Sequence, residues 1–422
     1  MMDSGPAANL EPAPEAASAD SHYAILHNRD FLLYLVARFI ASIGQQMLTV
    51  AVGWELYERT HSALALGLVG LTQMAPMLLL TLPAGHLADN RNRKHIILIT
   101  VLVISLASVG LALISKFNGD VLWIYACLLA TGTARTFLWP ASAAFLPQLV
   151  SRQNFSRAVT WNTGGFHLSS VAGPALGGAI IAATHSATSV YVINAVATLV
   201  CFALLCFVRS KPVNFVREKM RLASLVAGFR FVHANKIIFG IITLDMLAVL
   251  LGGATALLPV YAKDILRVGP TGLGLLQAAL PCGSLLTAIV LAHRPPMQEA
   301  GRALFWAVGA FGVATIGFGI STSFWLSLLM LFVCGATDNI SVVIRHTLVQ
   351  LLTPDEKRGR VSAVNSLFIG TSNELGGFES GFVAHFLGPV FAVVSGGVGT
   401  ILVVLGVAWK WPQIRRYGRL DD

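Results

Sequence analysis

Charged residues are scarce in this sequence. Only 12% of its 422 residues are Asp, Glu, Lys or Arg, whereas 55% are hydrophobic and the mean hydropathy is +0.72. Soluble domains carry about 25% charged residues, so a water-soluble chain of this length would lack the polar surface that it needs. The composition therefore predicts a protein whose surface lies largely in lipid, and it argues against a soluble enzyme.

Three further absences exclude other functions. The sequence has no GxxxxGK[ST] run, which disfavours ATP-driven transport by this chain alone. The first 25 or so residues have neither a basic segment nor an apolar run, so they do not form a signal peptide. The five cysteines lie in apolar stretches without metal-ligand spacing, so we expect no metal and no other cofactor: Cys127, Cys201, Cys206, Cys282 and Cys334.

Long apolar segments recur along most of the chain. A membrane-spanning helix needs about 20 mostly apolar residues. Twelve segments meet this need: 31–57, 64–86, 95–115, 121–146, 158–184, 187–208, 237–262, 271–292, 302–321, 324–349, 359–385 and 388–409. The sequence therefore predicts an all-α membrane protein with twelve transmembrane helices.

The positive charges are divided unevenly between the loops. If both termini are cytosolic, 22 of the 29 Lys and Arg residues fall on the cytosolic side, four on the other side and three within spans. Cytosolic loops carry an excess of Lys and Arg, so we predict that both termini are cytosolic. Because the basic residues lie in short loops and form no clustered basic face, we expect no nucleic-acid partner. The predicted order is a disordered cytosolic tail (1–28), a six-helix bundle (29–208), a linker with an amphipathic helix (209–236), a second six-helix bundle (237–411) and a cytosolic tail (412–422).

The two halves repeat each other. Leu146–Val150 aligns with Leu348–Leu352, and further matches follow at a constant offset of 203 residues: Asn162 with Asn365, Gly173 with Gly376 and Gly178 with Gly381. Because six helices separate the matching segments, both repeats cross the membrane in the same direction. The twelve helices therefore form two parallel six-helix repeats, with a substrate site expected between them.

The loop after the second span carries the most distinctive motif. Residues 85–94 read GHLADNRNRK, and the chain must reverse there within a few residues. Gly85 would permit close backbone approach, and Asp89 could accept from helix N-terminal amides or pair with a basic residue. Arg91, Arg93 and Lys94 would anchor the loop to anionic head groups.

This loop is similar to the signature G-x-L-x-D-R-x-x-R-R/K of the major facilitator superfamily. With Asn28–Phe31 and Ser62–Leu71, the chain resembles the enterobactin-exporter-like subfamily of these transporters over residues 28–410. The resemblance implies that the first, fourth, seventh and tenth helices line a central cavity. Asn90 stands where the family has arginine, which puts a gating salt bridge at that position in doubt.

A second motif lies in the fifth span. Residues 169–178 read SSVAGPALGG, in which Pro174 bends the helix and Gly173, Gly177 and Gly178 allow a neighbour to pack closely. The stretch is similar to the G-x-x-x-G-P-x-x-G-G motif of facilitator antiporters, with Ser169 in place of the first glycine. A kinked packing helix without an export role is the alternative interpretation.

Polar and charged residues within the spans are candidates for the transport site, because such residues usually face a cavity. Arg135 and Asp338 both lie about halfway across and occupy near-equivalent places in the repeat. The candidates for proton coupling are Asp338, Glu374 and Asp245, since a buried carboxylate can bind and release a proton. The candidates for the substrate cavity are Arg38, Gln45, Gln46, Arg135, Arg345 and Glu379. A structural ion-pair network of Asp338 with Arg135 or Arg345 is equally open.

These observations lead to one main functional hypothesis. It is proton-coupled export of a small amphipathic molecule by a monomeric secondary transporter, in which the two halves rock about a site at the membrane midplane. The family resemblance implies a siderophore or a drug-like compound as substrate and a bacterial inner membrane as the location, with protons and the lipid bilayer as the other partners. Uptake or facilitated diffusion of a small metabolite is one alternative. A membrane sensor or scaffold that transports nothing is another.

Overall fold

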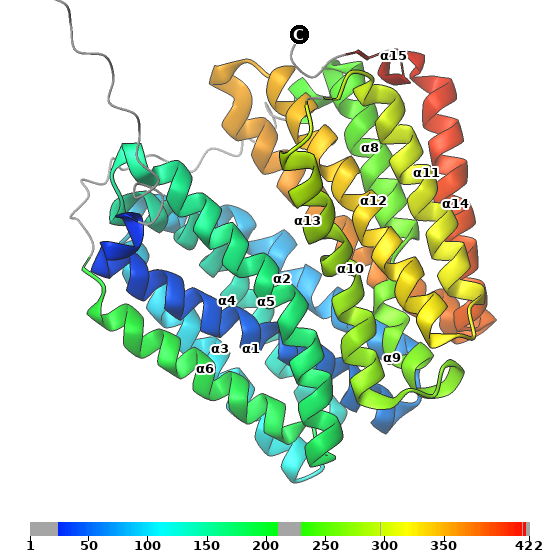
Figure 1. Ribbon diagram of the computed structural model, residues 1–422. Coiled ribbons are helices and arrows are strands. Elements are labelled where there is room, and N and C mark those ends of the chain that lie inside the picture. Colours follow the sequence, from blue (N-terminus) through cyan, green and yellow to red (C-terminus); the bar gives the residue numbers. More distant parts are fainter. Residues whose placement is uncertain (1–23, 210–228, 296, 416, 419–422) are drawn as a thin grey trace, which may run out of the picture.

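The structure is a computed structural model that describes residues 24–209, 229–295, 297–415 and 417–418, and these residues form helices joined by short loops (Figure 1). Most of the predicted N-terminal tail and residues 210–228 of the linker, with the amphipathic helix predicted there, lie outside the described residues.

The first six spans are continuous helices that begin and end within a few residues of the predicted limits: α1 (Arg29–Thr60), α2 (Ala63–Asn90), α3 (Arg93–Lys116), α4 (Val121–Leu149), α5 (Phe155–Thr184) and α6 (Thr188–Phe207). Asn28 caps α1 by accepting hydrogen bonds from the backbone amides of Asp30 and Phe31. Asn92 and Asp120 start α3 and α4 in the same way. Each cap satisfies amides that the first turn leaves free.

The second half begins with a broken helix. The predicted seventh span is α8 (Lys236–Leu251), followed by η4 (Ala254–Leu257), α9 (Leu258–Val260) and the π-helical turn η5 (Tyr261–Ile265). The break falls at Gly252 and Gly253. Glycine weakens a helix interior, and a Cβ on Gly252 would lie 2.6 Å from a ring carbon of Phe311. The helix is therefore broken at a position where glycine both weakens the helix and allows Phe311 to pack closely against the backbone.

The remaining spans are again continuous: α10 (Gly269–Ala292), α11 (Ala300–Ile320), α12 (Phe324–Leu351), α13 (Asp355–Leu387) and α14 (Pro389–Lys410), before the short α15 (Pro412–Arg415). Within the described chain, eleven helical segments are long and apolar enough to cross a membrane, counting α8 to η5 as one. The predicted eleventh span, α13, is 33 residues long but too polar to meet that criterion. The all-α fold class is confirmed.

The helices form two bundles that touch along two helix pairs. Helices α1–α6 pack with one another, as do the helices from α8 to α14, and the boundary between them is made mainly by α2 with α13 and by α5 with α10. Figure 1 shows that the axes of the two bundles diverge from this shared boundary. We call the end of the molecule where α1 begins the basic end, and the end where α1 finishes the sealed end.

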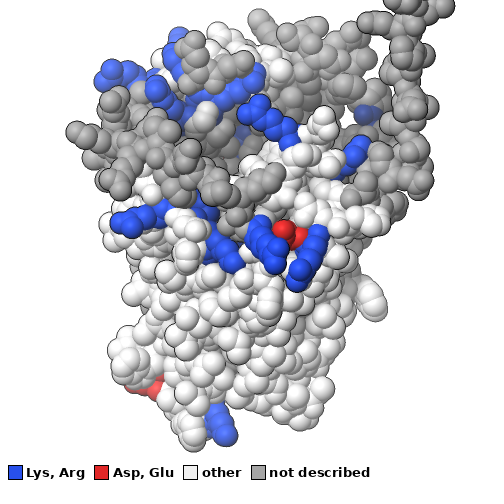
Figure 2. Space-filling view, turned by 90° about the vertical axis from the view of Figure 1, so that its left-hand side faces the viewer, with Lys and Arg blue, Asp and Glu red and all other residues white. Residues whose placement is uncertain are grey.

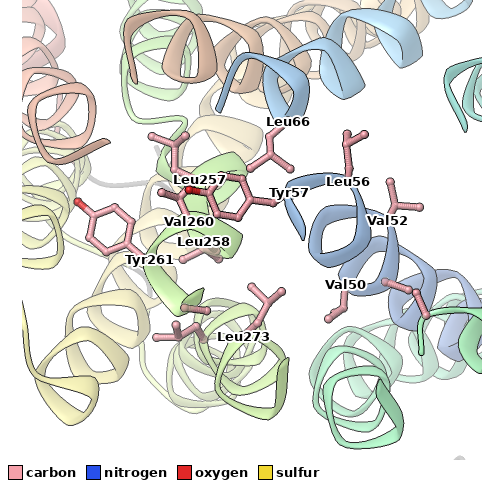
Figure 3. Close-up of a cluster of buried hydrophobic side chains, with 14 of the residues drawn as sticks. Val50, Val52, Leu56, Tyr57, Leu66, Leu257, Leu258, Val260, Tyr261 and Leu273 are labelled. Atoms are coloured by element: carbon pink, nitrogen blue, oxygen red, sulfur yellow. The ribbon is translucent and has the colours of Figure 1, made fainter. Parts of the chain in front are cut away.

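One hydrophobic core joins the bundles at the sealed end. It combines α1 residues such as Val52 and Leu56 with Leu257, Val260 and Leu273 of the second bundle (Figure 3). The other three clusters of buried apolar residues each belong to a single bundle. The apolar seal between the bundles in the described residues is therefore confined to one end.

The outer surface is apolar along the helices and basic at one end. Large side chains such as Trp139, Trp306, Trp325 and Trp409 are at least 75% exposed. Figure 2 shows Lys and Arg side chains gathered on the upper part of one face, while the lower part carries few charges. Exposed apolar surface of this extent needs lipid to cover it.

Candidate functional site

The sealed end holds a polar contact between the bundles. Tyr57 of α1 donates a hydrogen bond to a carboxylate oxygen of Asp264 in η5. The ammonium group of Lys263 lies 5.9 Å from the ring centre of Trp54 and 6.0 Å from that of Tyr57. A cation over an aromatic face is attracted to it, so both contacts hold the end of α1 against η5.

A buried ion pair supports α1 at the same end. Arg59 lies 2.5 Å from Glu55, one helical turn away, and also donates to the carbonyl oxygen of Gly119 at 2.9 Å. The charge of Glu55 is thereby neutralised inside the first bundle, and α1 is tied to the loop before α4. The i, i+4 spacing of these residues was visible in the sequence, whereas the contact of Tyr57 with Asp264 depends on the fold.

Two glycine pairs bring the bundles together closely. A Cβ on Gly178 of α5 would lie 3.0 Å from the Cα of Gly274 in α10, and a Cβ on Gly381 of α13 would lie 2.7 Å from the Cα of Gly67 in α2. Gly178 and Gly381 are the repeat-related positions identified above, so the two boundaries have equivalent packing. Small residues at a helix crossing let the backbones approach.

The rest of the fifth-span motif packs within the first bundle. A Cβ on Gly173 would lie 2.5 Å from Cβ of Gln46, and one on Gly177 would lie 3.0 Å from Cα of Met47. Helix α5 runs through Pro174 without interruption. The motif therefore fits α5 between α1 on one side and α10 on the other.

Gln45 and Gln46 have different surroundings. The side-chain amide of Gln46 donates to the hydroxyl of Ser170 at 3.0 Å, which joins α1 to α5. The backbone carbonyl of Gln45 accepts from Thr49 at 3.1 Å, and its side chain is partly exposed. Of the two amides, Gln45 is the one left for a ligand among the described residues.

Asp245 and Arg345 form an ion pair between α8 and α12. Their side chains are only 10% and 4% exposed, respectively. The sequence-based network placed Arg345 with Asp338, but two helical turns, about 10 Å, separate these two residues on α12. The observed pair removes Asp245 and Arg345 from the groups that stand open to a ligand.

Asp338 is a carboxylate without an ion-pair partner in the described part of the chain. It lies in the middle of α12 and is partly buried, and its backbone carbonyl accepts from Ser341 at 2.8 Å. The neighbouring Asn339 is tied to α10, because its amide donates to the carbonyl of Ser284 at 3.0 Å. The side chain of Asp338 is thus held at mid-depth on a fixed helix.

Arg135, Gln73 and Glu374 meet at the boundary of the bundles. Arg135 of α4 donates to the side-chain oxygen of Gln73 in α2 at 3.1 Å, and its charge acts on Glu374 of α13. A Cβ on Gly70 would lie 3.5 Å from Oε2 of Glu374 and 2.5 Å from its backbone oxygen, so glycine is needed for α13 to approach. The expected contact of Arg135 with Asp338 is not among the contacts of the described residues. The acid of the second bundle that lies near Arg135 is instead Glu374.

Glu379 lies one and a half turns further along α13. It is partly buried and accepts a weak hydrogen bond of 3.4 Å from the hydroxyl of Ser380.

Gln73 was not among the residues that we predicted from the sequence, since a lone glutamine in an apolar helix gives little signal. Its position three residues after Gly70 places it on the same face of α2, toward the boundary.

The loop between α2 and α3 is fixed by its basic residues. Arg93 donates to the carbonyl oxygens of Ala88 at 3.2 Å and Ala144 at 3.1 Å. Lys94 donates to those of Cys206 and Val208 at the end of α6, at 2.9 and 2.8 Å. These contacts occupy two of the three cations that we assigned to lipid head groups.

The other members of this loop motif make fewer contacts. Asp89 and Arg91 are exposed, and no partner for either side chain is found among the described residues. The space around a Cβ on Gly85 would be open to 4 Å, so the expected close backbone approach is absent there. Asn90 donates to the carbonyl of His86 at 2.9 Å.

Comparisons with known proteins agree with this architecture. The sequence profile of the family described as "transmembrane secretion effector" matches residues 20–416. The chain is 27% identical over 393 residues to the enterobactin exporter EntS of Escherichia coli O1:K1, covering 92% of this chain and 93% of that protein. It is 28% identical over 396 residues to EntS of Citrobacter koseri, with the same coverage.

Solved structures of other transporters share the fold. A POT family transporter in complex with a thioalcohol-conjugated peptide has a TM-score of 0.73 at 12% identity, covering 92% of this chain and 96% of that chain. A bacterial homologue of the lysosomal transporter Spinster, in an inward-facing and occupied conformation, has a TM-score of 0.70 at 15% identity, covering 95% and 98%. The match to the family profile spans nearly the whole chain, and the chain therefore belongs to the transmembrane secretion effector family of major facilitator transporters.

Proposed function

We propose that the protein is a proton-coupled exporter of a small amphipathic molecule that works as a monomer in a bacterial inner membrane. The excess of basic residues at the basic end supports a cytosolic location for that end and for both termini. With that orientation, the apolar core and the glycine pairs lie at the opposite face, which supports the interpretation that this state is open to the cytosol.

The electrostatic attraction between Arg135 and Glu374 across the boundary supports the coupling proposal. The two charges come from opposite bundles, and Glu374 lies at mid-depth on α13. A proton on Glu374 removes the attraction between the bundles at this level, while a deprotonated Glu374 restores it. One proton can thereby change the relative position of the halves, which is what alternating access requires.

Asp338 is the second proton-coupling candidate. It is the partly buried carboxylate at the middle of α12 without an ion-pair partner among the described residues. Asp245 was the third, and we now assign it to the structural pair with Arg345. Both residues belong to the second bundle, so a proton on Asp245 would not change the attraction between the two bundles.

The substrate class follows from the relatives. Two of them are named enterobactin exporters, so a siderophore is the first compound to test, with drug-like amphipathic compounds next. The bundles rock about the two glycine pairs, and the substrate passes between them.

The test uses inside-out membrane vesicles with an acidic lumen, in which an exporter exchanges luminal protons for external substrate. Enterobactin should accumulate in vesicles with the wild-type protein and should leave when nigericin collapses the pH gradient. Glu374→Gln and Asp338→Asn should abolish this gradient-driven accumulation but retain exchange of enterobactin at equal pH. Glu379→Gln, an acid on the same helix as Glu374, is the matched control. Gradient-driven flux that persists in both acid variants would remove the proton-site assignment.

A further inference from the structure

Helix α1 carries a polar stripe along one face. Arg38, Ser42, Gln45 and Thr49 recur every three or four residues, so their side chains share one side of the helix. All four are at least partly exposed in the structure. Polar groups in a spanning helix face a protein interior or a watery path rather than lipid, and this stripe begins about 14 Å from the basic end of α1.

The equivalent helix of the second bundle provides a reference. Asn28 caps α1 and Asn235 caps α8, each by accepting from the amides two and three residues later, and the two residues are 207 positions apart. At that offset, Arg38 corresponds to Asp245. The other three polar positions correspond to Val249, Gly252 and Ala256, so the predicted seventh span has no such stripe.

The two charged positions are satisfied differently. Asp245 is paired with Arg345 from α12. Arg38 has no carboxylate partner in the described part of the chain, and its buried Nε has no hydrogen-bond acceptor there. The second bundle therefore holds an ion pair at the repeat-related position of Arg38, whereas Arg38 itself has no acidic partner among the described residues.

The groups near Arg38 do not supply an anion. Its charge acts on Tyr34 and Cys201, both of which are buried and carry no charge at neutral pH in their usual form. A buried guanidinium donor without an acceptor is costly. An acceptor that arrives from solution would remove this cost.

We propose that Arg38 binds the acidic group of an organic anion, with Gln45 available to a polar group further along the same molecule. This inference rests on the proposed function and specifies its substrate as an amphipathic acid. The planar guanidinium suits a carboxylate, which it can engage through two parallel hydrogen bonds. The division of roles is simple: the first bundle binds the acid, and the carboxylates of the second bundle carry the proton.

The test is a binding measurement without any pH gradient. Full-length protein in lipid nanodiscs is titrated calorimetrically with benzoate and salicylate and, for comparison, with the neutral amides benzamide and salicylamide. Wild-type protein should bind each acid at least tenfold more tightly than its amide. Arg38→Gln should abolish the preference, and Arg38→Lys, which keeps the charge, should retain part of it.

Two further variants locate the effect. Arg302→Gln removes a surface arginine and should leave the preference unchanged, which excludes a general effect of net charge. Arg135→Gln should also retain it. The proposal is wrong if wild-type protein shows no preference for the acids, if Arg38→Gln preserves it, or if Arg135→Gln alone abolishes it. Folding of Arg38→Gln is checked by its melting temperature, and the lysine variant tests the charge independently.

The outcome is separable from that of the transport assay. An intact preference for acids together with loss of gradient-driven flux would contradict proton coupling but not the anion site. Gradient-driven flux in a protein that ignores the acidic group would contradict the anion site alone.

Discussion

Tyr57 of α1 and Asp264 of η5 are joined by a hydrogen bond that crosses between the bundles at the sealed end. The contact lies next to the buried apolar core that includes Leu56 and Leu257 (Figure 3). In the proposed transport cycle an outward-opening movement would separate α1 from η5, so this polar contact would have to break each time.

Replacing Tyr57 by phenylalanine should therefore favour opening of the sealed end. The ring is retained and only the hydrogen bond to a charged group is lost, which is worth about 1.5 kcal/mol or roughly a tenfold change in the opening equilibrium. Hydrogen exchange of residues 254–266, followed by mass spectrometry in nanodiscs, should become faster. Tyr125→Phe is the control, because Tyr125 donates to the carbonyl of Ala65 inside one bundle at 2.8 Å. Equal acceleration in both variants would contradict the assignment.

Gly178 should not tolerate even one added methyl group. A Cβ there would overlap the backbone of Pro270 and Gly274 in α10, so Gly178→Ala should push α5 and α10 apart and lower the melting temperature. Gly164→Ala on the same helix has open space around the new Cβ, and it should be neutral or slightly stabilising, since alanine favours helix over glycine. Thermal unfolding in detergent compares the two. Similar melting temperatures would show that the close approach is dispensable.

The pair of Asp245 and Arg345 should behave as a structural unit. Asp245→Asn or Arg345→Gln leaves one buried charge without its partner, and each should destabilise the fold by about 3 to 5 kcal/mol. The double variant removes both charges and should recover most of that loss. By contrast, the exposed pair of Arg302 with Glu299 should contribute less than about 1 kcal/mol. The free energy of unfolding of the single and double variants, measured by denaturation, tests this prediction. If the losses in the two single variants simply added up in the double variant, Asp245 and Arg345 would not act as a pair.

Lys94 should stabilise the C-terminal end of α6 against local opening. Its ammonium group donates to two carbonyl oxygens at that helix end, where a cation is stabilising by about 0.3 to 1 kcal/mol. Lys94→Met should speed hydrogen exchange at residues 203–209 by roughly two- to fivefold. Arg91→Met, which removes an exposed cation of the same loop, should leave that segment unchanged. A uniform change across α6 would point to global destabilisation instead.

The extent of the helices could be predicted from sequence because apolar runs and caps are local signals. Asn28 and Ser62 lie just before the first two apolar runs, and both act as caps in the structure. The break in the seventh span was missed, although Gly252 and Gly253 are adjacent there. A pair of glycines within an apolar run is also common in helix packing, so the sequence alone did not separate the two meanings.

The partners of the charged residues could not be predicted in the same way. Depth along a helix is readable from residue counts, and it placed Arg135 and Asp338 at one level. The rotation of each helix about its axis decides the partner, and that depends on packing across the whole bundle. Arg345 therefore faces Asp245, and Arg135 faces Gln73 and Glu374.

The two glycine pairs lie close to the sealed end, so each crossing point divides its helices into a short and a long part. Gly178 is six residues from the sealed end of α5 and 23 from its start, distances of about 9 and 35 Å along the axis. A rotation about this crossing therefore displaces the basic end of α5 about four times as far as the sealed end. In the proposed rocking movement, side chains near the sealed end would need to move only slightly while a wide entrance opened or closed at the other end. A short seal of the kind built around Tyr57 and Leu257 can thus govern a much larger passage.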